Sequence, residues 1–341
     1  MTKYNDWYWS RLKEFAQLAD EEGLILMHQN YFQHNIIEAG AHWTDSPWRP
    51  ANNINNTGFP EPAPYAGDKR IFVAEQFYDI DHPVRRELHK AYIKQCLNNF
   101  EDNSVIQLIS EEYTGPLHFV EFWLDVIAEW EAETGKKQLI ALSTTKDVQD
   151  AILADPVRSK IIDIIDIRYW FYRNDGTTYA PQGGQNLAPR QHARLTKPGG
   201  ISFQSAYRAV NEYKQQFPEK AVTYYSSTYP QQAWAIFMAK GSLASLPTVD
   251  NKQFFKDATK MDVVTQENKE GQYVLGNPSV GYIVYSENKN LDIDFIDSKN
   301  TYDVYWINSK TGNITKGKQR LKGGSSMQIE KQEAVLWLIK K

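Results

Sequence analysis

This sequence has very little cysteine, no long apolar runs and no excess of positive charge. Its 341 residues include a single cysteine, Cys96, which excludes an intrachain disulfide and a thiolate metal site. We expect Cys96 to be a small buried side chain. The longest apolar runs, such as residues 24–27, are far shorter than the roughly 20 residues of a membrane span. We therefore expect no membrane span.

The balance of charge disfavours nucleic acid as a partner, and the first residues leave the cellular localisation undecided. Lys and Arg number 38 against 42 Asp and Glu, so the net charge is -4. Without a large positive field, nucleic acid is not an expected partner. Residues 1–9 are polar and aromatic, unlike a secretory signal segment, so the residues alone leave the localisation unknown.

Aromatic residues are abundant. The chain holds 10 Trp, 20 Tyr and 15 Phe, which together make 13% of its residues. Rings stack on the C–H faces of sugars while amides satisfy their hydroxyls, so a composition rich in aromatic residues, Asn and Gln favours carbohydrate as a ligand.

Helix-like and strand-like segments alternate up to about residue 247. Runs that are apolar on both faces follow amphipathic stretches, which is typical of a parallel sheet flanked by helices. We therefore predict an α/β fold in which residues 1–247 form a (β/α)8-type barrel domain of catalytic type. We expect strands at residues 24–27, 105–110, 138–143, 161–169, 221–226 and 243–246, and helices at 9–22, 83–100, 116–134, 148–160, 203–217 and 231–240.

The number of strands is too small for a closed barrel. Six candidates are found where a barrel of this type has eight, and the chain starts on a helix. Either the first one or two βα units are missing upstream, which we favour, or the barrel is incomplete and something else covers its open side. Because an open sheet would expose apolar strand edges, we also consider a homo-oligomer.

The last part of the chain has a different residue pattern. From residue 251 to residue 341, short β-branched and aromatic runs are separated by turns rich in Asn, Gly and Lys, which predicts a small antiparallel β-sandwich. We expect its strands at residues 273–275, 281–286, 291–296, 302–308, 326–332 and 334–339.

In parallel barrels the active site lies where the strands end, so the residues at these ends are the first candidates. The first expected strand ends at His28 and Asn30, which could bind a substrate. A long segment rich in Trp and His, residues 31–79, follows it, and we expect this segment to form the wall and lid of a pocket. Its candidate substrate-binding side chains are His34, Glu38, Trp43 and Arg49, and Glu75 is a further acid.

Two adjacent acids follow the second expected strand. Glu111 and Glu112 occupy the place where a glycosidase keeps its proton donor. Strand parity places them on opposite faces, so at most one should point into the site. The alternative is that both are acids at a helix N-terminus, where they would interact with the helix dipole.

The next strands also end in polar residues. Lys146 follows the third strand, and Asp166, Arg168 and Trp170 share one face at the end of the fourth. Asp166 is therefore a candidate second carboxylate, and Arg168 with Trp170 suits an acidic or planar group. A structural salt bridge and a packed indole are the alternative. Gln185 lies in the segment that follows and is a further candidate for binding the substrate.

Other chemical templates do not fit. The spacing of His28 and His34 matches neither a helical nor a strand metal pair, and residues 183–184 lack the context of a phosphate loop. No G-x-S-x-G motif occurs. We therefore predict neither a metal nor a cofactor.

Some segments carry a family resemblance. They are HQNYFQHN at residues 28–35, WRPANN at 48–53, EYTGPLHF at 112–119 and IDIRYW at 165–170. These segments resemble a poorly characterised family of TIM-barrel, glycoside-hydrolase-like proteins from polysaccharide-degrading bacteria. YDVYWIN at residues 302–308, with Thr311 and Gly312, resembles the β-sandwich, often described as a putative collagen-binding domain, that follows such barrels.

The resemblance implies a role for Glu112. In retaining enzymes of the large barrel clan, the acid/base follows the fourth strand as Asn-Glu, and the matching residues 110–112 here read Ser-Glu-Glu. Glu111 could fill that place by register, but the EYTG motif favours Glu112. The clan's nucleophile has no match in residues 224–227, which favours inversion with a more distant carboxylate: Asp166, Glu38 or Glu75. The resemblance also implies a periplasmic or secreted protein.

The leading hypothesis is a glycoside hydrolase that acts on a plant or algal polysaccharide or its oligosaccharides. Arg168, Lys146 and Arg49 would suit an acidic sugar, although each could equally pair with an Asp or Glu. One alternative is a glycan-binding protein on a degenerate barrel, without catalysis. The other is a polysaccharide lyase with Tyr31 or His28 as base.

Overall fold

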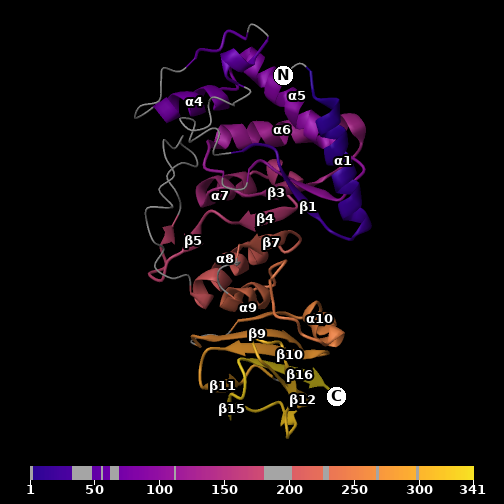
Figure 1. Ribbon diagram of the computed structural model, residues 1–341. Coiled ribbons are helices and arrows are strands. Elements are labelled where there is room, and N and C mark those ends of the chain that lie inside the picture. Colours follow the sequence, from indigo (N-terminus) through magenta and orange to yellow (C-terminus); the bar gives the residue numbers. More distant parts are fainter. Residues whose placement is uncertain are drawn as a thin grey trace. The chain divides into compact units, whose positions relative to one another are not determined.

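The computed structural model describes residues 3–32, 48–54, 57–61, 69–110, 113–179, 202–225, 230–265, 269–296 and 299–341 (Figure 1). The chain divides into two compact units. The first comprises Met1–Phe171 and Thr177–Gly199, and the second comprises Tyr172–Gly176 and Gly200–Lys341. The domain boundary expected between residues 247 and 251 lies inside the second unit and stays a prediction.

The long helices of the first unit begin and end at residues suited to those positions. The side chain of Asn5 accepts a hydrogen bond from the backbone N–H of Tyr8 at 3.2 Å and caps the first helix. Gly135 closes another helix with φ +69°, a left-handed conformation that favours glycine. These helices are α1 (Asp6–Glu21), α5 (Pro83–Asn99), α6 (Leu117–Thr134) and α7 (Lys146–Ala154).

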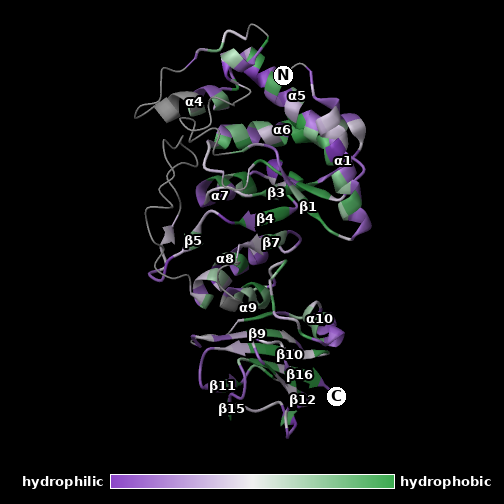
Figure 2. Ribbon diagram, in the orientation of Figure 1, coloured by the Kyte–Doolittle hydropathy of each residue, from purple (hydrophilic) through white to green (hydrophobic). Residues whose placement is uncertain are grey.

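Four short parallel strands form the sheet of the first unit. They are adjacent in the order β1-β2-β3-β4, as the alternation with helices predicts. Figure 2 shows these strands mostly in green, because their side chains are largely hydrophobic. The strands are β1 (Leu26–Gln29), β2 (Val105–Leu108), β3 (Leu139–Leu142) and β4 (Ile164–Ile167), and β5 (Phe171–Tyr172) and β6 (Thr178–Tyr179) follow.

The mixed α/β fold is confirmed, but barrel closure is not. Across the described residues the parallel strands form an open sheet. The strand expected at residues 243–246 is wrong, because Lys240 (φ 61°) and Leu243 (φ 55°) turn the chain there and leave no extended run. The segment 31–79, expected as the wall and lid of a pocket, contains two elements that were not predicted: the helical turn η2 (Pro50–Asn52) and the helix α4 (Lys69–Tyr78).

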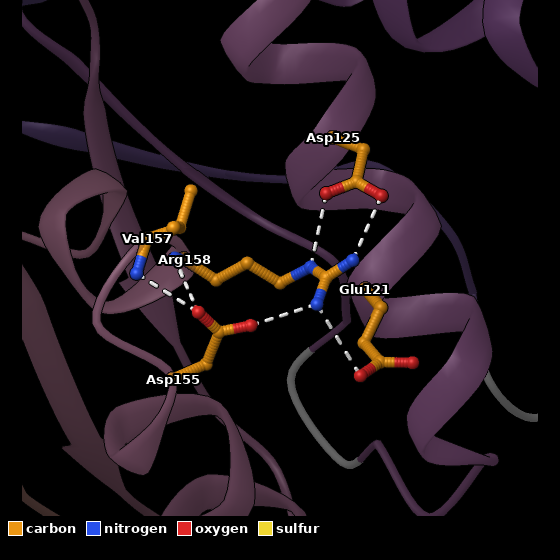
Figure 3. A network of polar contacts seen from close by, with 5 residues as sticks. All are labelled: Glu121, Asp125, Asp155, Val157 and Arg158. Atoms are coloured by element: carbon orange, nitrogen blue, oxygen red, sulfur yellow. Dashed lines mark hydrogen bonds and ion pairs between the residues drawn. The ribbon is translucent and has the colours of Figure 1, made fainter.

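An ion-pair network ties α6 to the turn η3 (Arg158–Ile161) that leads into β4 (Figure 3). The Arg158 guanidinium donates two hydrogen bonds to the Asp125 carboxylate, both at 2.9 Å. It also donates to Asp155 at 2.8 Å and to Glu121 at 3.4 Å. One cation therefore holds three carboxylates that would otherwise repel one another.

The second unit opens with helices around a short strand. The α8 helix begins after Ser202, whose hydroxyl accepts the backbone N–H of Ser205 at 3.1 Å. Its Phe203 ring stacks on Tyr285 at a centroid distance of 4.2 Å. The elements are α8 (Phe203–Gln216), β7 (Ala221–Tyr224), α9 (Pro230–Met238) and α10 (Lys252–Ala258).

Antiparallel strands complete the second unit. One sheet has the order β13-β12-β16-β10-β9-β8, with β14 also paired to β12, and a smaller sheet pairs β11 with β15. Buried side chains from both sheets, such as Leu291 of β11 and Val284 of β10, share one core. The antiparallel architecture agrees with the prediction. The strands are β8 (Asp262–Val264), β9 (Gln272–Asn277), β10 (Gly281–Ser286), β11 (Asn290–Ile293), β12 (Thr301–Ile307), β13 (Ile314–Lys316), β14 (Leu321–Lys322), β15 (Met327–Glu330) and β16 (Val335–Lys340).

Candidate functional site

The strand register separates the predicted site residues into two groups. Residues that are paired across parallel strands point to the same face of the sheet. One row of paired residues crosses all four strands: Gln29, Leu108, Ala141 and Ile164. Asp166 is two residues beyond Ile164 and shares the face of this row. His28 and Asn30 flank Gln29 and lie on the opposite face, so the sheet does not bring them together with Asp166.

His28 and Asn30 belong to a polar network between the sheet and its helices. The Gln107 side-chain oxygen accepts hydrogen bonds from His28 Nδ1 and from Asn30 Nδ2, both at 2.9 Å. Asn30 Oδ1 accepts the indole N–H of Trp123 in α6 at 2.7 Å. Burial lowers the pKa of His28, whose ring lies 4.8 Å from that of Phe100. These contacts hold β1 against β2, α6 and the residue that follows α5, and a role in binding substrate stays a prediction.

Asp166, Arg168 and Trp170 meet at the carboxyl end of β4. Arg168 Nε lies 3.0 Å from Asp166 Oδ2, and Asp166 is only 2% exposed. Gln149 of α7 donates to the backbone carbonyls of Leu142 at 2.8 Å and Asp166 at 3.2 Å, and it accepts the indole N–H of Trp170 at 2.7 Å. Gln149 thus fixes the ends of β3 and β4. The sequence reading missed it, although a polar residue within the apolar stripe of a helix was a signal.

The cations that were expected to suit an acidic sugar all have carboxylate partners. Besides the Arg168 pair, Lys146 Nζ lies 2.9 Å from an Asp150 oxygen and Arg49 Nε lies 2.8 Å from Glu61 Oε1. Lys146 also lies 4.9 Å from the centre of the Trp170 ring. These are the ion pairs that the sequence left open as an alternative. Glu75 is exposed on α4.

Several predicted site residues lie outside the described residues: Glu111, Glu112, His34, Glu38, Trp43 and Gln185. The residues that directly follow the two acids are tightly packed. Tyr113 is buried, forms a parallel bridge with Thr144 and donates its hydroxyl to the carbonyl of Pro116 at 2.9 Å. A Cβ on Gly115 would lie 2.6 Å from the Tyr113 ring and 2.7 Å from that of Tyr78, so only glycine fits there.

A buried histidine, His89 of α5, is a feature that the sequence reading missed. A carbonyl oxygen can only accept, so His89 Nε2 donates to Phe77 O at 2.9 Å, and Nδ1 then accepts the Tyr31 hydroxyl at 2.9 Å. Burial lowers the pKa of His89 to about 3 and raises that of Tyr31 well above its usual value. The signal was its spacing on one helical stripe with Ile93 and Cys96. The neighbouring Cys96 is also buried, and burial raises the pKa of its thiol to about 12.

A second candidate site lies in the second unit. It is a cavity of about 760 Å³ bounded by the exposed face of α8, by residues 172–176 and by the start of β9. The face of α8 contributes side chains at helical spacing: Gln204, Tyr207, Arg208, Asn211, Glu212 and Gln215. This stripe was visible in the sequence but was read only as part of a helix.

The walls of the cavity are held by charged and aromatic contacts. The Arg208 guanidinium carbon lies 3.8 Å from the centre of the Tyr172 ring, and Arg208 Nη1 donates a hydrogen bond to Gly176 O at 3.0 Å. The Tyr172 hydroxyl donates to the Glu212 carboxylate. These contacts fix a cation, an anion and a ring side by side at the edge of the cavity.

The floor of the cavity adds hydroxyl and amide groups. The Tyr207 ring lies 4.6 Å from that of Tyr273, and burial raises the pKa of Tyr207 to about 12, so its hydroxyl stays a donor. Among the described residues, no group donates a hydrogen bond to the buried Asn211 Oδ1. Tyrosine rings, amides and an arginine–glutamate pair around one cavity suit a ligand with many hydroxyls.

Within the described ranges, no three His, Cys, Asp or Glu side chains gather closely enough to bind an ion. The same ranges contain no helix with the length and apolar character needed to cross a bilayer.

Comparison with known proteins assigns the chain to a family. Residues 1–261 match the family described as a domain of unknown function (DUF6298), and the chain belongs to that family. The family match ends just before β8, the first strand of the antiparallel sheet, so the resemblance of residues 302–312 to a collagen-binding domain stays a prediction. No protein with curated annotation matches the chain.

Among the solved structures that match the chain are glycoside hydrolases. One is endo-glycoceramidase II from Rhodococcus sp., with 11% identity over 99% of this chain and 85% of that chain, and a TM-score of 0.34. Another is a β-porphyranase of glycoside hydrolase family 86 from Bacteroides plebeius, with 12% identity over 93% of this chain and 62% of that chain, and a TM-score of 0.31.

Proposed function

We propose that this protein acts on a glycan and hydrolyses glycosidic bonds of a plant or algal polysaccharide or its oligosaccharides. The observation that supports this proposal is the Asp166–Arg168 pair, a buried carboxylate fixed at 3.0 Å from a guanidinium at the carboxyl end of β4. In parallel α/β sheets the carboxyl ends of the strands are where ligands bind and reactions occur.

The proposed reaction divides the work between two carboxyl groups. Glu112 donates a proton to the leaving glycosidic oxygen while Asp166 accepts a proton from water, whose oxygen forms the new bond to the anomeric carbon. Arg168 positions the Asp166 carboxylate by a charge-assisted hydrogen bond. Glu111, Glu38 and Glu75 remain the other acids of the proposal. Residues 224–227 contain no acid that matches the nucleophile of retaining enzymes, so we propose a mechanism that inverts the anomeric configuration.

The proposal for the fold is a (β/α)8-type barrel that lacks its first one or two βα units. Its support is the order β1-β2-β3-β4, in which every strand runs parallel to its neighbour and β1 ends the series of described strands. The remaining predicted ligand-binding side chains would then surround the strand ends: His28, Asn30, His34, Trp43, Arg49, Lys146, Trp170 and Gln185.

Asp166→Asn tests the assignment of the second carboxylate, with Asp163→Asn as the matched control. Asp163 lies at the amino end of the same strand, is exposed, and accepts the backbone N–H of Ile140 at 2.9 Å. On any polysaccharide that the wild type cleaves, we expect Asp166→Asn to lower the release of reducing ends by roughly 10²-fold or more. Asp163→Asn should retain turnover close to the wild type. Equal turnover in both variants would remove Asp166 from the mechanism.

A second candidate function is glycan binding without catalysis, which the cavity on α8 favours. In that case the wild type binds oligosaccharides and cleaves none, and Asn211→Ala and Tyr207→Ala weaken binding. Titration of the same oligosaccharides into the wild type and both variants by calorimetry separates this function from hydrolysis.

The lyase alternative has less support in the structure. Tyr31 donates its hydroxyl to His89, and burial raises the pKa of Tyr31 well above its usual value, which opposes its use as a base. A lyase would leave a double bond in its product, so ultraviolet absorbance recorded together with reducing ends distinguishes the two reactions.

A further inference from the structure

Positive charge is concentrated in the last strands of the chain. Residues 299–341 contain nine Lys and Arg against three Asp and Glu, whereas the whole chain has a net charge of -4. A local excess of this kind creates a positive potential that the overall charge conceals. Since most of these cations lie on or beside β12, β13 and β14, the strand pairing gathers them on one part of the antiparallel sheet.

A cavity of about 820 Å³ lies within this basic region and is lined by β12, β14, β15 and the turns between them. We call it the basic groove. Its lining includes one carboxylate, Glu330, against four cations: Lys299, Lys318, Arg320 and Lys322. The apolar lining consists of Val304, Trp306, Leu321, Met327 and Ile329.

The cations at the site of the first unit all have carboxylate partners, whereas only some cations of the basic groove have one among the described residues. Arg320 Nε lies 2.8 Å from Asp303 Oδ1, and this hydrogen bond, with the charges of Lys341 and Lys316, lowers the pKa of Asp303. For Lys318 and Lys322, both exposed, no carboxylate lies within ion-pair distance among the described residues. Two positive charges of the basic groove therefore remain available to an anion.

We infer that the basic groove binds an anionic glycan chain through its sulfate or carboxylate groups, separately from the site at the sheet ends. The inference rests on the proposed function only in that the bound polymer is a glycan. The lysines supply the charge that an acidic sugar needs, and the partly exposed side chains of Met327 and Ile329 offer apolar contact to the C–H face of a sugar ring.

The test is affinity electrophoresis of the full chain in gels that contain one polysaccharide each. Carrageenan supplies a sulfated galactan, polygalacturonate a carboxylated polymer, and agarose a neutral galactan. The test variant is Lys318→Gln/Lys322→Gln, and the matched control is Lys289→Gln/Lys310→Gln. The control removes the same charge from exposed lysines of the same unit that do not line the basic groove.

We expect one or both anionic polymers, but not agarose, to retard the wild type and the control. The variant in the basic groove should bind roughly 3- to 10-fold more weakly, since it loses two exposed ion pairs with the polymer. The preferred polymer identifies sulfate or carboxylate as the recognised group. Equal weakening in both double variants, equal retardation by agarose, or equally strong binding of duplex DNA would overturn the inference.

This result is independent of turnover. If the wild type cleaves no polysaccharide but Lys318 and Lys322 are needed for retardation, the proposed hydrolysis fails and the basic groove stands. If cleavage depends on Asp166 while no anionic polymer retards the protein, the proposed hydrolysis stands and the inference about the basic groove fails.

Discussion

Acidification should destabilise this protein through His89, because this side chain is buried and neutral in the folded state. Its pKa is about 3 when folded, against an ordinary value of 6.5 in an unfolded chain. Since the folded pKa is the lower of the two, the unfolded chain binds the proton more readily. Stability is therefore fully present above pH 6.5 and is lost progressively as the pH falls from 6.5 towards 3.

The size of the effect follows from the two pKa values. Between pH 7 and pH 5, the protonation of His89 in the unfolded chain lowers the free energy of unfolding by about 2 kcal/mol. Other groups also titrate in this range, so the contribution of His89 is measured as the difference in free energy of unfolding between the wild type and a variant without this histidine. His89→Gln is the reference, because an amide can still donate to Phe77 O and accept from Tyr31.

Urea denaturation of the wild type and His89→Gln at pH 7 and pH 5 measures this difference. We expect the wild type to lose about 2 kcal/mol more than the variant over this pH range. The two proteins should behave alike between pH 7 and pH 8. The reasoning is refuted if both lose the same free energy between pH 7 and pH 5, because His89 would then be able to take up a proton in the folded state.

Two further predictions concern stability. Replacing Arg158 by Met leaves three carboxylates without their cation. We therefore expect the free energy of unfolding, measured by urea denaturation, to fall by about 1–2 kcal/mol, and by less in about 0.5 M salt. A loss that salt does not change would contradict the ion-pair account. Gly312→Ala places a Cβ 2.1 Å from the carbonyl oxygen of Thr248 at φ +76°, whereas Gly23→Ala has a similar φ of +69° and nothing within 4 Å. We expect about 2–4 kcal/mol of destabilisation for Gly312→Ala and about 1 kcal/mol for Gly23→Ala in thermal melts, and equal losses would show that the close contact is relieved without cost.

Local patterns predicted most of the regular structure. Apolar residues at helical spacing and suitable end residues identified α1, α5, α6, α8 and α9, and runs apolar on both faces identified the four strands of the parallel sheet. The α4 helix was missed because it lies in a long segment rich in turn residues. The apolar run at residues 243–246 was misleading, since Leu243 takes φ 55° in a tight turn.

The site was less predictable because it depends on register. Parity along one strand correctly placed Asp166 and Arg168 on one face, but only the pairing between strands shows that His28 lies on the other face. The interactions of Gln149 with Trp170 and of His89 with Tyr31 join residues far apart in the chain. Each was visible only as a polar residue within an apolar helical stripe.

The most direct test of the account is the leaving-group dependence of Glu112→Gln. A general acid matters for a poor leaving group, such as a sugar hydroxyl, and hardly for a dinitrophenolate, which departs without a proton. With the sugar identified by a polysaccharide screen, we predict that the variant loses roughly 10²–10⁴-fold in turnover of the natural glycan but stays within about tenfold of the wild type on the dinitrophenyl glycoside. Equal losses on both substrates, or no loss on either, would contradict the assignment of Glu112 as the acid, and a wild type that turns over neither substrate would contradict hydrolysis itself.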